Sequence, residues 1–253
     1  MEIVLTIAGS DSSAGAGIQQ DLKTITAHGC YGATVITSVT SQNTLGVQAA
    51  FAMPPEVVAS QLQAVLSDLE PRAIKIGMLP NEQVAQAVVS ELSAYLASHP
   101  VPVVYDPVMI STSGYPLMSP DAVSYIVEHL FPLCTLITPN LPEAEKLRDA
   151  LKPYTYLLKG GHADGNAMTD VLHTPDGNTT EFSIQKIRTG NLHGTGCTLS
   201  SAIAACLAKG DSLPEAVSRA KVFITEAIRN SVHIQIGHGN GPVQILTCSD
   251  HGC

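Results

Sequence analysis

Short apolar runs rich in β-branched residues alternate along this chain with longer stretches of helical periodicity. This alternation limits the possible folds more than any other feature. The runs are too uniformly apolar for strands with one solvated face, as expected of parallel strands that helices cover on both sides. The predicted strands are Ile3–Ala8, Ala33–Val39, Ala73–Gly77, Val101–Tyr105, Thr135–Thr138 and Thr155–Lys159. The predicted helices, with apolar residues three and four positions apart, are Ile18–Ala27, Glu56–Leu69, Glu82–Ala97, Asp121–Leu130, Leu141–Leu151, Thr198–Ala208 and Leu213–Asn230. The pattern predicts an α/β fold, an open and mostly parallel sheet with helices on both faces.

Two late runs, Asp170–Thr174 and Thr180–Lys186, flank the turn-forming string Pro175-Asp176-Gly177-Asn178. They predict a short antiparallel hairpin at a sheet edge. Helix starts are expected at Pro54-Pro55, Asn81, Ser119-Pro120, Asn140 and Pro214. No linker, low-complexity tract or repeat interrupts the pattern, so we expect residues 1–253 to form a single domain.

Composition excludes several classes of protein. Hydrophobic residues make up 45% of the chain and charged residues 14%, which is too apolar for a disordered chain. The net charge is −9 without a basic run, so a general nucleic-acid binder is not expected. The apolar stretches are too short to cross a bilayer and residues 1–9 lack a basic segment, so we expect no membrane association and a cytoplasmic location. Six cysteines without a CxxC pair are expected to be free thiols in such a compartment.

The first predicted strand ends in a loop of small residues, Gly9-Ser10-Asp11-Ser12-Ser13-Ala14-Gly15-Ala16-Gly17. In sheets of this kind, ligands bind beyond the carboxyl ends of the strands. Small residues there let backbone N–H groups approach a ligand closely. The loop lacks the GxGxxG spacing of dinucleotide sites and the lysine and hydroxyl residue of a P-loop. It is therefore either a ligand loop or a plain tight turn.

A second motif, His193-Gly194-Thr195-Gly196-Cys197-Thr198-Leu199-Ser200, opens an apolar helix. Gly194 and Gly196 leave amides unobstructed at a helix N-terminus, which is an anion site by its dipole and its free donors. The thiolate form of Cys197 should be favoured at such a position. The alternative is an ordinary helix start with a buried thiol.

Charged residues follow two other strands in this charge-poor chain. Glu143 lies in Thr138-Pro139-Asn140-Leu141-Pro142-Glu143, and Lys159 begins Lys159-Gly160-Gly161-His162. A phosphate and a cation could use these two side chains. The alternative is that the two residues form a surface ion pair.

Together these motifs resemble the ribokinase-like superfamily and, within it, the bacterial hydroxymethylpyrimidine/phosphomethylpyrimidine kinases of thiamine biosynthesis. The resemblance runs from Leu5 to about Val243. The matching strings are Thr6–Asp11, Gly15–Gln19, Asp21–Thr24, Ser41–Thr44, Lys75–Leu79, Asp106–Met109, Thr138–Ala144, Lys159–His162 and His193–Thr198. So many matches in the same order predict a single ribokinase-like kinase domain.

The resemblance implies a role for each motif. Gly194, Thr195 and Gly196 would form the anion hole for the transferring phosphoryl group, with Cys197 as base beside the substrate hydroxymethyl group. Lys159 and Thr195 would contact ATP phosphates, and Asn140 and Glu143 would help to place Mg²⁺. Gln42 would bind the polar edge of the pyrimidine, since a carboxamide both donates and accepts. The substrate pocket would be completed by Gly9, Asp21, Met78 and Val108.

The implied activity is ATP- and Mg²⁺-dependent phosphorylation of 4-amino-5-hydroxymethyl-2-methylpyrimidine and of its monophosphate. A pyridoxal or pyridoxine kinase and a non-catalytic vitamin sensor on the same fold remain alternatives. A NAD-dependent dehydrogenase is not expected, because this chain lacks the dinucleotide-binding fingerprint of those enzymes. The resemblance also implies a lid at Met109–Pro116 and a homodimer. Relatives carry an extra helix between Glu143 and Lys159, for which this chain has no room, although one crossover helix still fits. The tail Cys248–Cys253 matches no motif.

Overall fold

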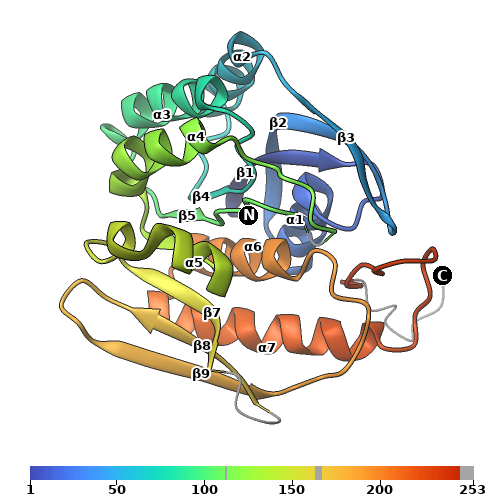
Figure 1. Cartoon of the computed structure of the whole chain (residues 1–253). Helices are drawn as coiled ribbons and strands as arrows, with labels where there is room; N and C mark the ends of the chain where they lie inside the picture. Colours follow the sequence, from blue (N-terminus) through green and yellow to red (C-terminus); the bar gives the residue numbers. More distant parts are fainter. Residues whose placement is uncertain (112, 163–166, 246–253) are drawn as a thin grey trace.

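Nine strands form one sheet in the order β3-β2-β1-β4-β5-β6-β7-β8-β9 (Figure 1). The structure is a computed structural model, and it describes residues 1–111, 113–162 and 167–245. The central strands from β2 to β7 pair in parallel, whereas β3 at one edge and β8 and β9 at the other pair antiparallel. The strands are β1 Ile3–Asp11, β2 Tyr31–Asn43, β3 Gly46–Ala52, β4 Ala73–Ile76, β5 Val103–Tyr105, β6 Leu136–Ile137, β7 Tyr156–His162, β8 Ala167–His173 and β9 Thr179–Gln185.

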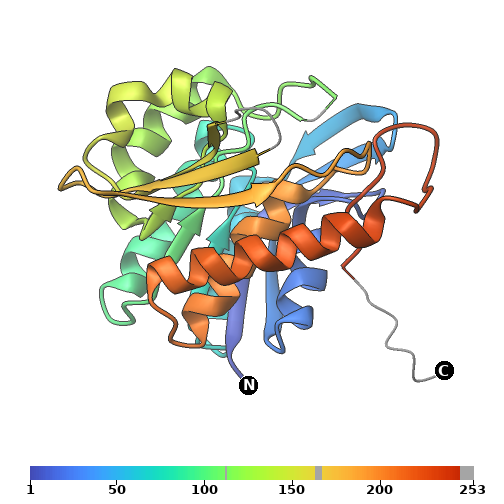
Figure 2. The ribbon, with the colours of Figure 1, turned by 90° about the horizontal axis from the view of Figure 1, so that it is seen from below.

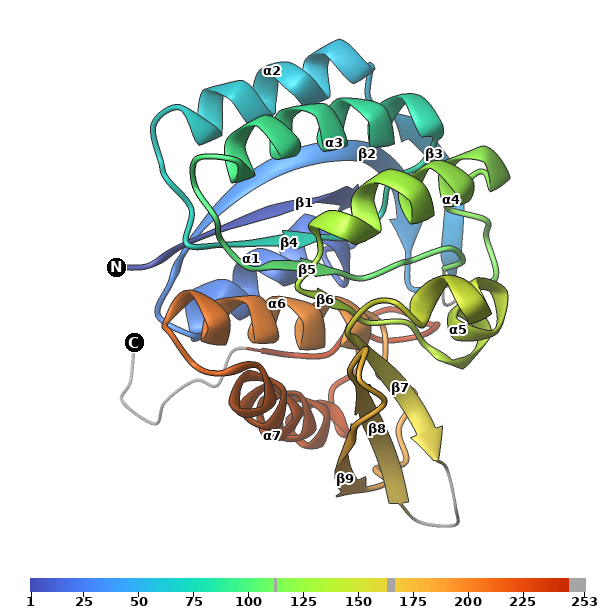
Figure 3. The same ribbon diagram turned by 90° about the vertical axis from the view of Figure 1, so that its left-hand side faces the viewer.

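Helices cover both faces of the sheet (Figure 3). They are α1 Gly17–Ala27, α2 Pro55–Leu66, α3 Glu82–Leu96, α4 Pro120–Tyr125, α5 Leu141–Leu147, α6 Thr195–Ala208 and α7 Leu213–Ser231. Consecutive residues of β1 serve different layers: Leu5 packs in the core under α2 and α3, and Val4 in the core under α1, α6 and α7. Both faces of the central strands are therefore buried, which explains their continuous apolar runs.

The predicted fold class is confirmed, including the antiparallel hairpin, which is β8 and β9 at the sheet edge. Figure 2 shows α7 running beside this hairpin. The predicted helix starts are also present: the Asn81 side chain accepts from the Val84 amide, and Asn140 and Glu143 form a capping box. One crossover helix, α5, connects β6 to β7, so the short segment between them suffices.

Three local predictions need correction. The second strand is longer than predicted and folds back into β3, which the sequence analysis missed. The helix predicted at Asp121–Leu130 changes from α4 to a π-helical turn at Ile126–Leu130. The helix predicted at Leu141–Leu151 ends as a 3₁₀ turn at Arg148–Leu151. In the latter two, the helical periodicity was recognised but the change in hydrogen-bonding pattern was not.

The cysteines within the described residues, Cys30, Cys134, Cys197 and Cys206, are free, as expected, while Cys248 and Cys253 lie outside those residues. No helix in the described ranges is both long and apolar enough to span a membrane.

Candidate active site

A cavity of about 530 Å³ lies beyond the carboxyl ends of the parallel strands. Its wall includes residues at or just after the ends of β1, β2, β4, β5, β6 and β7. This is where open α/β sheets bind ligands, close to the point where the strand order reverses around β1. The loop from Gly9 to Gly17 contributes to the same wall, which favours a ligand loop over a plain turn.

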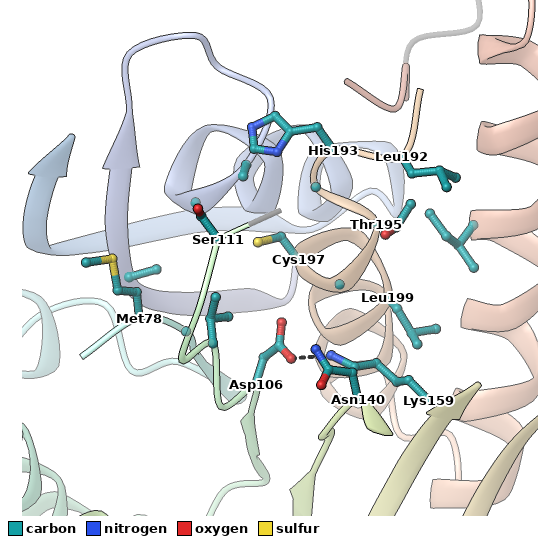
Figure 4. Close-up of a pocket in the computed structure, with 18 of the residues that line it drawn as sticks. Met78, Asp106, Ser111, Asn140, Lys159, Leu192, His193, Thr195, Cys197 and Leu199 are labelled. Carbon is teal, nitrogen blue, oxygen red and sulfur yellow. Dashed lines mark hydrogen bonds and ion pairs between the residues drawn. The ribbon is translucent and has the colours of Figure 1, made fainter. Parts of the chain in front are cut away.

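All but one of the predicted site residues line this cavity. They are Gly9, Gln42, Met78, Val108, Asn140, Glu143, Lys159, Gly194, Thr195, Gly196 and Cys197. Figure 4 shows that the labelled members converge from different elements, with Cys197 between Met78 on one side and Leu199 on the other. The sequence motifs therefore meet at one place in the fold.

The first turn of α6 forms one wall of the cavity. Gly194 precedes this turn with a φ of 83°, a left-handed conformation that favours glycine. A Cβ atom at Gly196 would lie 3.2 Å from Asp106 Oδ2 and 3.5 Å from Lys159 Nζ. Glycine thus leaves space between the helix start and these two charged groups. Since the first amides of a helix have no acceptor within it, this space suits an anion.

Asp106 and Lys159 form a partly buried ion pair opposite that turn. Lys159 Nζ lies 2.6 Å from Asp106 Oδ1, which also accepts from the Thr138 hydroxyl at 3.1 Å (Figure 4). Burial alone would lower the pKa of Lys159, but the carboxylates of Asp106 and Glu143 hold it above the usual lysine value. Lys159 is therefore a permanent cation in the cavity wall. The alternative of a surface ion pair between Lys159 and Glu143 is wrong, because Lys159 pairs with Asp106 and Glu143 is buried.

Asp106 Oδ2 is buried without a hydrogen-bond partner among the described residues. Glu143 lines the same part of the cavity, and burial raises the pKa of its carboxyl although the Lys159 ammonium opposes the shift. No cluster of three or more histidine, cysteine or carboxylate residues suited to a metal occurs in the described part of the chain. Two carboxylates beside an anion site nevertheless fit a magnesium ion, which commonly takes one or two protein carboxylates and completes its shell with phosphate oxygens and water.

The thiol of Cys197 differs from its prediction. Burial raises its pKa to about 11, and the Lys75 ammonium lowers it only in part. The carboxylates of Asp21 and Asp106 oppose Lys75 and also favour the neutral thiol. The predicted preference for thiolate is therefore wrong, because desolvation and two nearby anions outweigh the helix N-terminus.

Asp21 is the predicted site residue that does not line the cavity. Its fully buried carboxylate accepts from Ser201 Oγ at 2.7 Å, from Thr6 Oγ1 at 2.6 Å and from Lys75 Nζ at 2.8 Å. Both oxygens of Asp21 therefore have partners within the protein, and the residue supports the cavity wall through Lys75 rather than lining it. Lys75 lines the cavity in its place, and Asp21 holds the pKa of this buried lysine above the usual value against the effect of burial.

Gln42 contacts a second polar cluster that the prediction of site residues missed. Its side-chain amide lies 3.1 Å from His193 Nε2, and that nitrogen lies 2.8 Å from Asp11 Oδ2. Burial would raise the pKa of Asp11, but hydrogen bonds from His193 and Ser13 hold it below the usual value. Both residues stand in motifs quoted for the family resemblance, and their positions at the end of β1 and just before α6 are the signal that could have identified them.

Another part of the wall is largely apolar and was not predicted. Its apolar residues are Met168, Ile184, Ile187, Leu192, Leu199, Ile224 and Ile228, and the charged residues Asp170, Lys186 and Lys221 of the same elements also line the cavity. These residues come from the β8–β9 hairpin, the segment after it, α6 and α7. Ile224 and Ile228 are one helical turn apart on α7, a spacing as typical of an ordinary core as of a ligand site. The sequence alone therefore could not distinguish them from core residues.

Comparison with known proteins identifies the family. The family model for phosphomethylpyrimidine kinase matches residues 11–244. The hydroxymethylpyrimidine/phosphomethylpyrimidine kinase of Rhizobium meliloti is 45% identical over 260 residues, which cover 95% of this chain and 96% of that protein. The crystal structure of the Clostridium difficile phosphomethylpyrimidine kinase covers 90% of this chain and 100% of its own, with 42% identity and a TM-score of 0.76. An ADP complex of Bacillus subtilis pyridoxal kinase covers 96% and 97%, with 32% identity and a TM-score of 0.84. This chain belongs to the phosphomethylpyrimidine kinase family and is a kinase.

Proposed function

We propose that this chain transfers the γ-phosphoryl group of ATP to the hydroxymethyl group of 4-amino-5-hydroxymethyl-2-methylpyrimidine, and then the γ-phosphoryl group of a second ATP to the resulting monophosphate. The observation that carries this proposal is the order of groups in one cavity. The helix start with its charged neighbours, the polar residues Gln42 and His193, and the aliphatic side chains around Leu199 all line this cavity. The similarity to proteins named as kinases of both substrates supports the same conclusion.

The nucleotide occupies the apolar side in this proposal. An adenine ring would pack against the wall that includes Leu199 and Ile224, as ligand pockets are mostly apolar. Lys159, Thr195 and Asn140 would contact the phosphates. Asp106 and Glu143 would hold Mg²⁺ together with phosphate oxygens. When bound, the ion would neutralise negative charge on the phosphates.

The acceptor occupies the polar side. Gln42 would bind the amino and ring-nitrogen edge of the pyrimidine, with Gly9, Met78 and Val108 around the ring. The hydroxyl oxygen attacks the γ-phosphorus, the bond to the ADP oxygen breaks, and ADP leaves with that electron pair. The amides of Gly194–Cys197 stabilise the charge that grows on the equatorial oxygens. Cys197, as thiolate, accepts the hydroxyl proton.

The segment 109–116 would close over this reaction and exclude water. Residue 112 lies outside the described part of the chain, but the segment bends back on itself through a bridge between Ile110 and Pro116. A Cβ atom at Gly46, on the β2–β3 turn, would lie 3.1 Å from the Ser113 side chain. The described part of the segment thus extends from the cavity wall, which includes Ile110 and Ser111, to Gly46 at the start of β3.

A cytoplasmic homodimer with a single domain also belongs to this proposal. Val39 on β2 and Phe51 on β3 are cross-strand partners, and both side chains are exposed. Strand β3 also lies at the edge of the sheet. A second copy of the chain would cover such a face. Sedimentation at micromolar concentration tests it: a dimer that dissociates on Phe51→Glu is expected, and a wild-type monomer contradicts it.

Pyridoxal phosphorylation is the second candidate, favoured by the similarity to pyridoxal kinase structures. The Staphylococcus aureus pyridoxal kinase in complex with pyridoxal covers 97% of this chain and 93% of its own, with 31% identity and a TM-score of 0.83. Pyridoxal also presents a hydroxymethyl arm on an aza-ring. Both activities can therefore be measured together.

A coupled assay of ADP release tests both candidates. Wild-type protein with ATP, Mg²⁺ and the aminopyrimidine should release ADP well above the rate without acceptor, and faster than with pyridoxal. In Gly196→Ala the added methyl group enters the anion space, and we expect kcat/KM to fall by roughly 10²–10³-fold. Gly190→Ala is the matched control, because a Cβ atom there meets nothing within 4 Å. If neither acceptor raises ADP release, the kinase proposal fails and a sensor is favoured.

A further inference from the structure

We propose that His193 and Thr40 hold the carboxamide of Gln42 in one orientation, with its oxygen toward His193 and its NH₂ group toward Thr40. The two are positioning residues for recognition of the acceptor ring. This inference rests on the proposed function, because it states which ring edge the site can bind.

The first constraint comes from Asp11 and His193. His193 Nε2 lies 2.8 Å from Asp11 Oδ2, and a carboxylate only accepts hydrogen bonds. Oδ2 is already fixed by the amides of Gly15 at 3.1 Å and Ala16 at 2.9 Å. His193 Nε2 therefore carries a proton and donates. The structure places Gln42 Nε2 3.1 Å from this nitrogen, but a nitrogen that donates cannot accept from an NH₂ group. The carboxamide must therefore be turned end for end, with its oxygen toward His193.

The second constraint is independent and comes from Thr40. Its hydroxyl lies 3.1 Å from the carbonyl oxygen of Ser10 and 3.2 Å from the other end of the Gln42 carboxamide. A threonine hydroxyl has one proton, and the Ser10 carbonyl can only accept it. The Thr40 oxygen is then left as an acceptor for Gln42, which requires the NH₂ group on that side. The two ends of a carboxamide have the same shape, and hydrogen bonds decide which end is which.

The position of His193 is itself fixed. Its backbone N–H donates to Gly241 O at 3.1 Å and its carbonyl accepts from Val243 N at 3.0 Å. A Cβ atom at Gly15 would collide with its ring, so the loop after β1 packs directly on the imidazole. The loop after β1, His193 and Gln42 thus form one hydrogen-bonded cluster beside the cavity, which we call the Gln42 cluster.

In this orientation the carboxamide keeps one lone pair on its oxygen and one N–H for a ligand. It matches a ring that offers an amino donor to the oxygen and a ring nitrogen to the N–H. The hydroxymethyl arm must point to the first turn of α6, so the ring cannot turn over to present the reverse order. The Gln42 cluster therefore selects an aminopyrimidine against a 4-oxo ring. In the 4-oxo ring, the carbonyl group accepts and the ring N–H donates, which reverses the order of donor and acceptor.

The test compares kcat/KM for 4-amino-5-hydroxymethyl-2-methylpyrimidine with that for its 4-oxo analogue. Wild type should prefer the amino ring by roughly 100-fold or more, because the wrong ring leaves polar groups unpaired. Thr40→Val and His193→Phe each release one end of the carboxamide, so the preference should fall by about 10-fold or more while KM for ATP stays unchanged. Thr40→Ser keeps the hydroxyl and should retain the preference. Thr24→Val, a buried threonine on α1 whose hydroxyl donates to Gln20 O at 2.9 Å, is the matched control.

An unchanged preference in Thr40→Val overturns the proposal, and so does an equal loss of activity on both rings. Should His193→Phe fail to fold, the isosteric Thr40→Val carries the test. A nitrogen-15 spectrum of histidine-labelled resting protein supplies a readout without turnover. The proton of His193 is expected on Nε2 at neutral pH, and an unprotonated Nε2 overturns the proposal. If wild type phosphorylates neither ring, the proposed function fails. The spectrum still shows whether His193 Nε2 carries the proton that the orientation of Gln42 requires.

Discussion

The two sides of the cavity are built from different chemistry. The side that we propose for the pyrimidine is polar, with Gln42, His193 and Asp11 joined by hydrogen bonds and Lys75 paired to Asp21 beneath them. The side that we propose for the nucleotide is lined mainly by aliphatic side chains such as Leu199 and Ile224, and the Lys221–Asp170 ion pair is its charged part. A polar site strongly rejects a ligand that leaves its groups unpaired. An apolar wall discriminates only weakly between ligands that differ by a methylene group. The comparison predicts strict recognition of the acceptor and tolerant recognition of the base.

The largest effect is expected where the two sides meet, at Cys197. Cys197→Ser should lower kcat by ~10²–10⁴-fold, because a hydroxyl ionises far less readily than a thiol. The KM values for both substrates and the melting temperature should not change. Steady-state kinetics and a thermal melt check this, and substrate protection against iodoacetamide would place the thiol in the cavity. A Cys197→Ser enzyme with the wild-type rate would contradict the role as base.

The raised pKa of Cys197 adds a pH dependence. With a pKa of about 11, the thiol is protonated at neutral pH, and its thiolate fraction rises with pH. The logarithm of kcat/KM should therefore rise by about one per pH unit between about pH 7 and 9. In Cys197→Asp the carboxylate is already ionised, so this slope should disappear. A flat profile for wild type would mean that the proton leaves by another route.

The second effect concerns the support of the polar side. Lys75→Met leaves the Asp21 carboxylate buried without its cation, which should cost about 3–5 kcal/mol of the free energy of unfolding. The Arg219–Asp211 pair is the control, because the Arg219 side chain is 65% exposed. Arg219→Met should cost at most about 1 kcal/mol. Urea denaturation measures both, and similar small losses would show that burial does not distinguish the two pairs.

The third effect separates the two sides directly. Gln42→Leu keeps a similar volume but leaves the polar edge of the bound ring unpaired, which costs roughly 1–3 kcal/mol. KM for the pyrimidine should rise while KM for ATP stays the same. Equal increases in both would indicate that Gln42 supports the fold rather than the ring.

The smallest effect is expected on the apolar side. Ile224→Val removes one methylene group from the wall, and such changes cost about 0.5–1.5 kcal/mol. KM for ATP should rise by roughly 2- to 10-fold with no change for the pyrimidine. Initial rates at varied ATP measure this. A larger effect on the pyrimidine would reverse the assignment of the two sides.

The architecture could be predicted because its signals are local. Each central strand is a continuous apolar run, and helix starts such as Asn81 and Ser119 carry side chains that cap their own helices. Strand β3 could not be predicted in the same way. Its residues Gly46–Ala52 are half-buried or exposed, and it becomes a strand only by pairing with β2.

The residues of the candidate site also differ in whether local sequence could predict them. Residues in glycine-rich or charged motifs, such as Gly196 and Lys159, were identified because their surroundings in the sequence are unusual. Asp21 is predicted in the substrate pocket, but the sequence does not show that Thr6, Lys75 and Ser201 bind its carboxylate. The thiol of Cys197 was misjudged because its pKa depends on burial and on Asp106, more than 90 residues away. Properties set by distant neighbours were not accessible from the sequence.

The hydrogen bonds that assemble the polar side join residues that are far apart in the sequence. Asp11 bonds His193, Asp21 bonds Ser201, and Gln20 bonds the Val243 carbonyl, across separations of 182, 180 and 223 residues. Contacts at such separations close late in folding, because they incur the entropy of closing nearly the whole chain. During synthesis the parallel strands emerge long before α6, so a nascent chain holds the start of the site without its anion-binding turn. The site therefore becomes complete only after α6 and the segment around Val243, which bonds Gln20 and His193, have been synthesised.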